Sequence, residues 1–424
     1  MILSYIYNTL KYRKWRLLLL VALFIFALKA AGFILNFRPH INQLQELHKC
    51  PVCYGTSACN YVNKISIVPL GLFQLISYLF GVGNVFSGLL DENKIILKKL
   101  AHSDELEQFD RMLCENKGLS HFCTKKIRAY RNDINFYQLI EKELTRDFTN
   151  DDLSRLRICP STKNLNALLH KVFLNNINVD KETLAINIWT LISVNPEPLL
   201  LQILPADEGW PVPKYLGACG RVIIEEYVGL PLTAYYNVPW LIRAEIAISL
   251  LNAAYMFTFK NQIFGFYLTD ISADNIAIDS HNQAKFVDLE NVIVVDKNVS
   301  LQERPAGWEQ LHENTENLNC PNYFSYSPME ICSHQLSDHN FFAICQLLLD
   351  FNIKEGSIPG GLLHSIPKDI LQQFSNVQHF LQECNNPKES QTRINAGLQL
   401  KHLLETILSQ SKTSTFPEVH KLAE

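Results

Sequence analysis

The chain has 424 residues, enough for one large catalytic domain with extensions or for two or three smaller domains. Hydrophobic residues make up 47% and charged residues 19% of it, which excludes a wholly disordered or collagen-like protein. The 38 Lys and Arg residues nearly balance the 42 Asp and Glu residues, and the net charge is -4. A dedicated nucleic-acid-binding protein would be strongly basic, so we expect no nucleic-acid partner.

Residues 1–36 are predicted to be a signal peptide or a signal anchor. An apolar run at 17–35 follows several basic residues and approaches the length of about 20 residues that spans a bilayer. Lys29 interrupts this run and the small residues after it permit cleavage, so both alternatives stay open. In either case the positive-inside rule sends residues 37–424 into the lumen. Contact with a membrane is expected only through residues 17–35, if they are not cleaved.

Eleven cysteines in a lumenal chain predict a set of disulfides with one thiol left over. Cys50, Cys53 and Cys59 lie close together in a Cys-rich segment at 37–64. Zinc binding is the alternative there, but three thiols without a histidine at finger spacing favour at least one disulfide. Cys345 lies in an apolar run and is expected to be a free thiol in the core. Asn298 begins the sequon Asn-Val-Ser and is a candidate for glycosylation.

In chain order, the predicted elements are strand-rich at first and helical later. Residues 65–90 carry no charge, yet proline, glycines and polar residues interrupt them. We therefore expect a buried helix near 73–80 and a glycine-rich strand instead of a second membrane span. A short strand at 95–98, a helix from 103 to 113, and a mostly helical block from about 110 to 200 follow. The remaining predictions are a short apolar run at 199–204, a strand at 222–224, a helix at 240–257, strands within 263–278 and 285–295, and helices from about 336 to 409.

Three polar residues in the second half of the chain have the spacing of a kinase active site. Asp270 and Asn275 fit the catalytic loop H-R-D-L-x-x-x-N, and Asp288 stands thirteen residues later, where a kinase has D-F-G. Upstream, Ile95-Ile96-Leu97-Lys98 corresponds to V-A-I-K. Each match alone is weak, because such pairs arise by chance. Together, in this order, they predict a nucleotide site.

Phosphoryl transfer depends on charge neutralisation and positioning more than on covalent catalysis. We expect Lys98 to hold the phosphates of ATP, and Asn275 and Asp288 to bind the Mg²⁺ or Mn²⁺ that accompanies it. Asp270 is the candidate acceptor for the proton of a substrate hydroxyl. Residues 222–229 resemble the strand and hinge between kinase lobes, which makes Glu226 a further candidate for nucleotide binding. Residues 81–88 form only a loose phosphate loop, and a strand turn without a ligand fits them equally well.

Four stretches resemble the divergent protein kinase domain family, in its second branch, also called the deleted-in-autism proteins. They are residues 50–55, 208–211 together with 214–221, 288–297 and 338–348. The resemblance spans the chain from about Cys50 to the C-terminal helices and places the nucleotide site on the four residues Lys98, Asp270, Asn275 and Asp288. It implies a secretory-pathway protein, resident in the Golgi or ER lumen or secreted, whose enzymatic activity is not assured.

The predicted fold class is α+β, a bilobal protein-kinase-like fold with a helical insertion in the N-lobe. The expected domains are the Cys-rich segment 37–64, an N-lobe at 65–225 with the insertion at about 110–200, and a C-lobe at 226–424.

The sequence also departs from the kinase pattern. Leu268 and Thr269 replace the His-Arg of the catalytic loop, and Ser272 stands where serine/threonine kinases have a phosphate-binding lysine. Glu290 replaces the glycine of D-F-G and could be a third metal ligand or could repel phosphates.

The glutamate that pairs with Lys98 stays open between Glu105, Glu107 and Glu141. Two functions therefore fit the sequence. The first is an ATP-dependent kinase acting on a hydroxyl substrate, such as an unknown lumenal or extracellular protein. The second is a pseudokinase that works as a secreted or Golgi interaction module.

Overall fold

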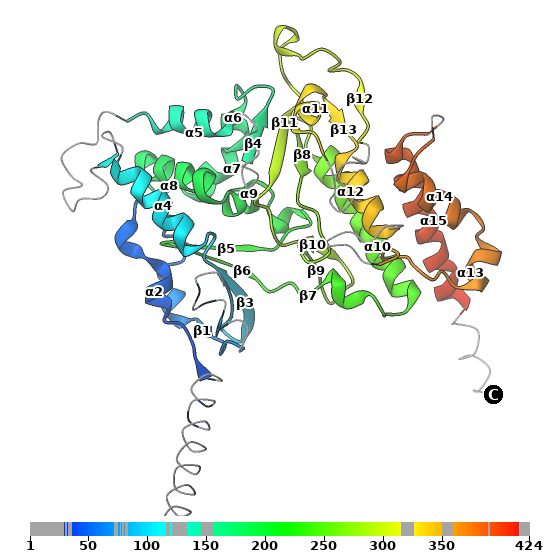
Figure 1. Ribbon diagram of the computed structural model, residues 1–424, viewed down its shortest axis with the longest axis horizontal. Helices are drawn as coiled ribbons and strands as arrows, with labels where there is room; N and C mark the ends of the chain where they lie inside the picture. The colour runs from blue at the N-terminus through cyan, green and yellow to red at the C-terminus, as the bar shows by residue number, and fades with distance from the viewer. Residues whose placement is uncertain are drawn as a thin grey trace, which may run out of the picture.

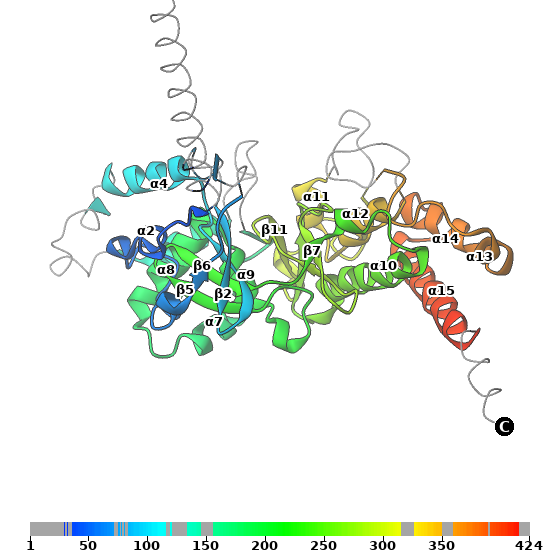
Figure 2. The same cartoon turned by 90° about the horizontal axis from the view of Figure 1, so that it is seen from below.

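The computed structural model describes residues 36–71, 84–115, 119–120, 134–145, 156–314, 326–349, 359–388 and 391–414, with a few further positions between 29 and 80. The chain forms two lobes, a sheet with flanking helices and a mostly helical half (Figures 1 and 2). Apart from isolated positions, the predicted signal segment at 1–36 lies outside the described residues. The bilobal α+β arrangement agrees with the predicted fold class. The exact domain limits stay a prediction.

The N-lobe sheet has the strand order β1-β2-β3-β6-β5, and neighbouring strands run antiparallel. The strands are β1 (Ser66–Ile67), β2 (Val85–Leu90), β3 (Asn93–Lys98), β5 (Tyr215–Cys219) and β6 (Val222–Glu226). Asp91 and Glu92 connect β2 to β3 with φ angles of 47° and 70°, the positive values that a two-residue hairpin requires. Strands β1 and β2 thus occupy both ends of the uncharged segment 65–90. The helix expected near 73–80 and the loose phosphate loop at 81–88 fall partly outside the described residues.

The pairing of β3 with β6 decides which side chains meet Lys98. Ile96 lies opposite Glu225, and Lys98 lies opposite Ile223. Residues two apart on a strand share a face, so Lys98 and Glu225 are diagonal neighbours on the same face of the sheet.

Helices from the predicted insertion lie beside the N-lobe sheet (Figure 1). They are α4 (Ser103–Glu115), α5 (Phe136–Leu144), α6 (Leu165–Leu168), α7 (His170–Asn175), α8 (Lys181–Val194) and α9 (Glu197–Ile203). Asp180 caps the N-terminus of helix α8, and its side chain accepts a hydrogen bond from Thr183 N. Its apolar residues are buried on several sides, because it packs against both α5 and α9. The apolar run at 199–204 belongs to α9.

The C-lobe contains two three-stranded sheets, ordered β10-β9-β7 and β4-β11-β8. The strands are β4 (Leu156–Cys159), β7 (Leu230–Pro231), β8 (Phe264–Leu268), β9 (Ile276–Ile278), β10 (Ala284–Phe286) and β11 (Val292–Asp296). Strand β4 comes from the insertion and runs parallel to β11. The insertion was predicted to belong to the N-lobe, but it also contributes a strand to the C-lobe.

Helices form the rest of the C-lobe and confirm the helical prediction for about 336–409. They are α10 (Trp240–Tyr255), α11 (Pro328–Ser333), α12 (His339–Leu348), α13 (Lys368–Gln373), α14 (Asn376–Asn385) and α15 (Arg393–Ser414), with a parallel bridge between β12 (Leu311–His312) and β13 (Leu336–Ser337). In the described part of the chain, the continuous helix 240–260 is long and apolar enough to cross a membrane, and a bent helix pair at 181–208 would pass the same test jointly. The first is the central helix of the C-lobe, and 61% of its most apolar window is buried.

Disulfides tie distant elements together. Cys50 is bonded to Cys53, and Cys59 to Cys219 on β5, so the Cys-rich segment with its helix α2 (Ile41–Gln45) is fastened to the N-lobe sheet. The prediction of at least one disulfide in this segment is therefore confirmed. A third bond joins Cys159 on β4 to Cys332 on α11.

The prediction of a free thiol at Cys345 is wrong. Cys345 on α12 is bonded to Cys384 on α14, with 5.4 Å between their Cα atoms. The two helices pack against each other, which brings together cysteines that are 39 residues apart in sequence. An apolar run around a cysteine indicates burial, and burial does not exclude a disulfide.

Candidate functional site

Lys98 is the last residue of β3, and its ammonium group lies between two buried carboxylates. Nζ is 2.8 Å from Oε1 of Glu197 and 2.8 Å from Oε1 of Glu225, and it also donates to the carbonyl oxygen of Val287. Glu197 begins helix α9 and Glu225 lies on β6, and each is 2% exposed. One lysine therefore joins the N-lobe sheet, the insertion and the segment before Asp288.

The two carboxylates control the charge of this group. Burial alone would lower the pKa of Lys98, but Glu197 and Glu225 outweigh burial and raise it, so Lys98 is charged. Burial raises the pKa of both glutamates, Lys98 opposes the increase, and nearby Asp288 adds to it. One ammonium cannot neutralise two carboxylates and Asp288 as well. Further positive charge, from a cation or a proton, is needed to balance the group.

Asp270, Asn275 and Asp288 lie on loops that follow strands of the C-lobe. Asp270 and Asn275 are on the loop between β8 and β9, and Asp288 follows β10. Val287 N donates to the carbonyl oxygen of Asn275 at 3.0 Å, which keeps Asn275 next to Asp288. The Asn275 Nδ2 donates to the Asp270 carboxylate at 3.2 Å and to its carbonyl oxygen at 3.3 Å. The Asn275 amide oxygen stays available as a ligand.

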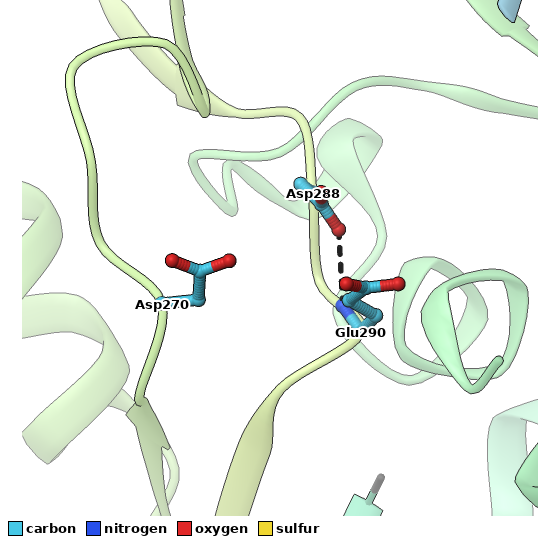
Figure 3. A group of neighbouring side chains, drawn as sticks. All are labelled: Asp270, Asp288 and Glu290. Atoms are coloured by element: carbon cyan, nitrogen blue, oxygen red, sulfur yellow. Dashed lines mark hydrogen bonds between the residues drawn. The ribbon is translucent and has the colours of Figure 1, made fainter. Parts of the chain in front are cut away.

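Asp270, Asp288 and Glu290 form a carboxylate cluster. Each offers an oxygen within 4.8 Å of the others, and Figure 3 shows Asp270 on one chain segment facing the other two on the next. Burial raises the pKa of Glu290 to about 7, with the charges of Asp288 and Asp270 adding to the effect. Burial and Asp288 also raise the pKa of Asp270.

These donors suit the cation that the sequence predicts. Carboxylate and amide oxygens are the hard ligands that Mg²⁺ and Mn²⁺ prefer, and a divalent cation would relieve the crowding of like charges. Asn275 and Asp288 can hold such a cation, with Glu290 and Asp270 adjacent. When bound to ATP, the cation would neutralise charge on the phosphates.

A cavity of about 510 Å³ lies beside the cluster, within the usual size range of small-molecule sites. Its walls include side chains from both lobes: Asn84, Val85, Lys98, Lys99, His102, Glu105, Asn195, Glu197, Asn275, Asp288 and Glu290. Three of the predicted site residues, Lys98, Asn275 and Asp288, therefore share one cavity. Glu226 is not part of this wall, and its carboxylate pairs with Lys285 at 2.5 Å. Its role in nucleotide binding stays a prediction.

Neither partner of Lys98 was predicted from the sequence. Among the described residues, Lys98 pairs with none of the three glutamates considered, although Glu105 lines the cavity. Glu197 lies in the sequence Asn195-Pro196-Glu197-Pro198, which is typical of a helix end and does not by itself indicate an ion pair. Glu197 stands next to an apolar run, and Glu225 lies on an apolar strand. Charged residues in such positions indicate a buried ion pair.

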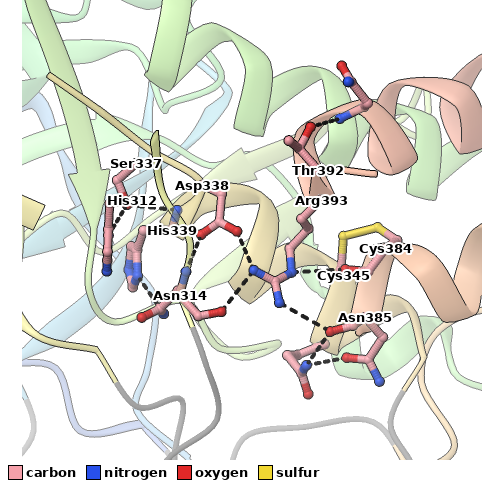
Figure 4. A network of polar contacts seen from close by, with 12 residues as sticks. His312, Asn314, Ser337, Asp338, His339, Cys345, Cys384, Asn385, Thr392 and Arg393 are labelled. Atoms are coloured by element: carbon pink, nitrogen blue, oxygen red, sulfur yellow. Dashed lines mark hydrogen bonds and ion pairs between the residues drawn. A yellow bond between two sulfur atoms is a disulfide. The ribbon is translucent and has the colours of Figure 1, made fainter. Parts of the chain in front are cut away.

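A buried polar network holds the strand that leads into the catalytic loop, and Figure 4 shows the part of it around Asp338, His339 and Arg393. His339 Nε2 donates to the carbonyl oxygen of Leu268 at 2.8 Å, and Asn340 Oδ1 accepts from Leu268 N at 3.2 Å. Next to them, Arg393 forms an ion pair with Asp338, whose Oδ1 also accepts from the backbone of Asn314. The first residues of α12 therefore fix the backbone two residues before Asp270.

The two lobes, the lysine at the end of β3 and the Asp-Asn pair followed by Asp288 define a protein-kinase-like protein. Residues 188–387 match the family described as the protein-kinase domain of FAM69. The chain is 33% identical to Divergent protein kinase domain 2A of Xenopus tropicalis over 385 residues, 87% of this chain and 88% of the relative. It is 32% identical to the human 2A protein over 378 residues, covering 85% and 86% of the two chains, and 27% identical to human Divergent protein kinase domain 2B over 355 residues, 78% of each. The chain belongs to the divergent protein kinase domain family, which confirms the resemblance drawn from the sequence.

Proposed function

We propose that this protein binds ATP with Mg²⁺ or Mn²⁺ and transfers phosphate to a hydroxyl group on a lumenal or extracellular protein. The observation that supports this most is the shared cavity, in which Lys98 from the N-lobe meets Asn275 and Asp288 from the C-lobe. Kinase chemistry requires this combination of a phosphate-binding cation and metal-binding oxygens. Membership of a kinase-like family agrees with it.

Each residue has a distinct role in this proposal. Lys98 binds phosphate oxygens, and Asn275 and Asp288 contribute ligands for the cation. Asp270 is exposed, and its raised pKa makes it a better proton acceptor than an ordinary aspartate. The Asn275 amide orients the Asp270 carboxylate through its hydrogen bond.

A pseudokinase is the second candidate, because of how Lys98 is held. Glu197, Glu225 and the Val287 carbonyl all engage its ammonium group, so phosphates must compete with an additional carboxylate. Ser272 also removes one positive charge that ordinary kinases supply near the transferring phosphate. A binding module without catalysis fits these two features.

The experiment is a comparison of two aspartate variants. Asp288→Ala should abolish metal-dependent ATP binding, because it removes a charged ligand of the cation. Asp270→Ala should keep ATP affinity and lower the rate of phosphate transfer by about two to four powers of ten, the range for a positioned general base. Asp207→Ala, an exposed carboxylate away from the cavity, is the matched control and should change neither quantity.

Three results distinguish the alternatives. If the wild-type protein binds ATP and shows a transfer activity that Asp270→Ala removes, the kinase proposal stands. If it binds ATP without such activity, the pseudokinase stands. If it binds no ATP with Mg²⁺ or Mn²⁺, both readings of this cavity fail.

We also propose that residues 37–424 lie in the lumen of the secretory pathway. The disulfides support this, because oxidising compartments are where such bonds persist. Asn298 is exposed and would be accessible to a glycosyltransferase there. In sealed microsomes the chain should resist protease added outside. The wild type should carry a glycan that increases its mass, and the Asn298→Gln variant should lack this increase. Digestion of the region around Asp270 from the cytosolic side would refute the proposed orientation.

A further inference from the structure

Asn195 lies at the sharp bend between helix α8 and the helical segment 197–208 that begins with α9, where the chain turns by 118°. It is 5% exposed, and its backbone is extended, with φ -161° and ψ 119°. Pro196 follows it, and a residue before proline is restricted to this extended region. The bend is therefore held in one conformation, with the Asn195 side chain among the residues that line the cavity.

Both ends of the Asn195 amide are engaged. Its Oδ1 accepts a hydrogen bond from Glu197 N at 2.9 Å, and its Nδ2 donates to Oε2 of Glu290 at 2.8 Å. A backbone N–H can only donate, so the oxygen of the amide must face Glu197. The nitrogen must then face Glu290, and the orientation of the amide is unambiguous.

This arrangement connects the two charged groups of the cavity. On one side Asn195 accepts from the backbone N–H of Glu197, the first residue of α9, whose carboxylate reaches Lys98. On the other side it restrains Glu290, whose carboxylate belongs to the cluster with Asp288. A carboxylate that accepts one amide hydrogen bond keeps lone pairs for a cation.

We propose that Glu290 is a third oxygen ligand of the cation held by Asn275 and Asp288, and that Asn195 is the positioning residue that orients it. The inference rests on the proposed function, since it concerns the same cation. Hydrogen bonds from neighbouring residues commonly orient metal-binding carboxylates, and their loss typically weakens metal binding about 10- to 100-fold. Glu290, which stands in place of the D-F-G glycine, thus has a hydrogen-bond partner, Asn195, from another part of the chain.

The test measures Mn²⁺ affinity of the full-length protein without nucleotide, by electron paramagnetic resonance of free Mn²⁺, and ATP affinity separately. Asn195→Ser keeps a hydroxyl that can cap α9 but cannot reach Glu290, and Asn195→Ala loses both contacts. Both variants should bind Mn²⁺ about 10- to 100-fold more weakly than the wild type. Asn135→Ser is the matched control, because Asn135 makes a similar capping bond to Gln138 N on α5, away from the cavity.

A double-mutant cycle tests whether Asn195 influences Mn²⁺ binding through Glu290. Glu290→Gln should weaken Mn²⁺ binding, and Asn195→Ser should add less than about twofold once Glu290 is replaced, since Asn195 acts through Glu290. Thermal unfolding in EDTA shows whether each variant remains folded. A merely structural role of Asn195 would lower stability in EDTA and leave the cycle additive.

The outcomes separate this inference from the proposed function. If Asp288→Ala abolishes binding of ATP with Mn²⁺ while Asn195→Ser binds Mn²⁺ within twofold of the wild type, the inference is overturned and the proposed function stands. Additive losses in the cycle overturn it as well. If Asn195→Ser and Glu290→Gln weaken Mn²⁺ binding non-additively but the wild type binds no ATP, the inference stands and the proposed function fails. A wild type that binds no Mn²⁺ in the absence of nucleotide overturns the inference alone, because the proposed function is judged by the binding of ATP.

Discussion

His339 should make the protein sensitive to mild acid. Burial lowers the pKa of His339 from its ordinary value of 6.5 to about 4, and the nearby charges of His312 and Arg393 act in the same direction. In the neutral ring, Nε2–H donates to the Leu268 carbonyl and Nδ1 faces the amide nitrogen of Asn314 at 3.3 Å. Protonation would place two donors against each other at Nδ1.

The size of the effect follows from proton linkage. The folded protein binds this proton less readily than the unfolded chain, so the stabilisation is fully present above pH 6.5 and is lost as the pH falls toward 4. At about 1.4 kcal/mol for each pH unit, the total is about 3 kcal/mol, of which about 1.4 kcal/mol should be lost by pH 5.5. Because His339 supports the strand before Asp270, the loss should affect the catalytic loop.

Urea unfolding at pH 7.5 and 5.5 measures this effect, with His339→Gln as the reference. Glutamine can still donate to the Leu268 carbonyl but does not titrate in this range. The difference in free energy of unfolding between wild type and variant should change by about 1.4 kcal/mol in favour of the variant at pH 5.5. A difference that is the same at both pH values would refute the reasoning.

Three other predictions concern buried contacts. Glu225→Gln should strengthen ATP binding several-fold in a calorimetric titration, because one carboxylate fewer competes with phosphates for Lys98; unchanged or weaker binding would contradict this. Arg393→Leu should lower the free energy of unfolding in urea by about 3–5 kcal/mol, since it leaves the buried Asp338 carboxylate uncompensated; a loss under about 1 kcal/mol would show that the pair is not needed. Cys384→Ser should cost up to about 4 kcal/mol by the chain-entropy estimate for a loop of 39 residues; equal stability of variant and wild type under oxidising conditions would argue against this disulfide.

The sequence alone selected Asp270, Asn275 and Asp288 as candidate site residues. They lie within one stretch of chain that consists of short strands and turns. The distances along such a stretch limit how far apart the side chains can lie, so comparison with the kinase pattern selected these three residues as candidates. Lys98 could be identified in the same way, because it ends a strand that is recognisable by its apolar residues.

Only the tertiary structure decided what surrounds these residues. Glu197 is 99 residues from Lys98 in sequence, and Asn195 is 95 residues from Glu290. The bond between Cys345 and Cys384 and the pairing of β4 with β11 likewise join separate parts of the chain. Local patterns describe burial and secondary structure but not which buried faces meet. Strand register and helix packing therefore determined that a second carboxylate reaches Lys98 and that an asparagine from the insertion holds Glu290.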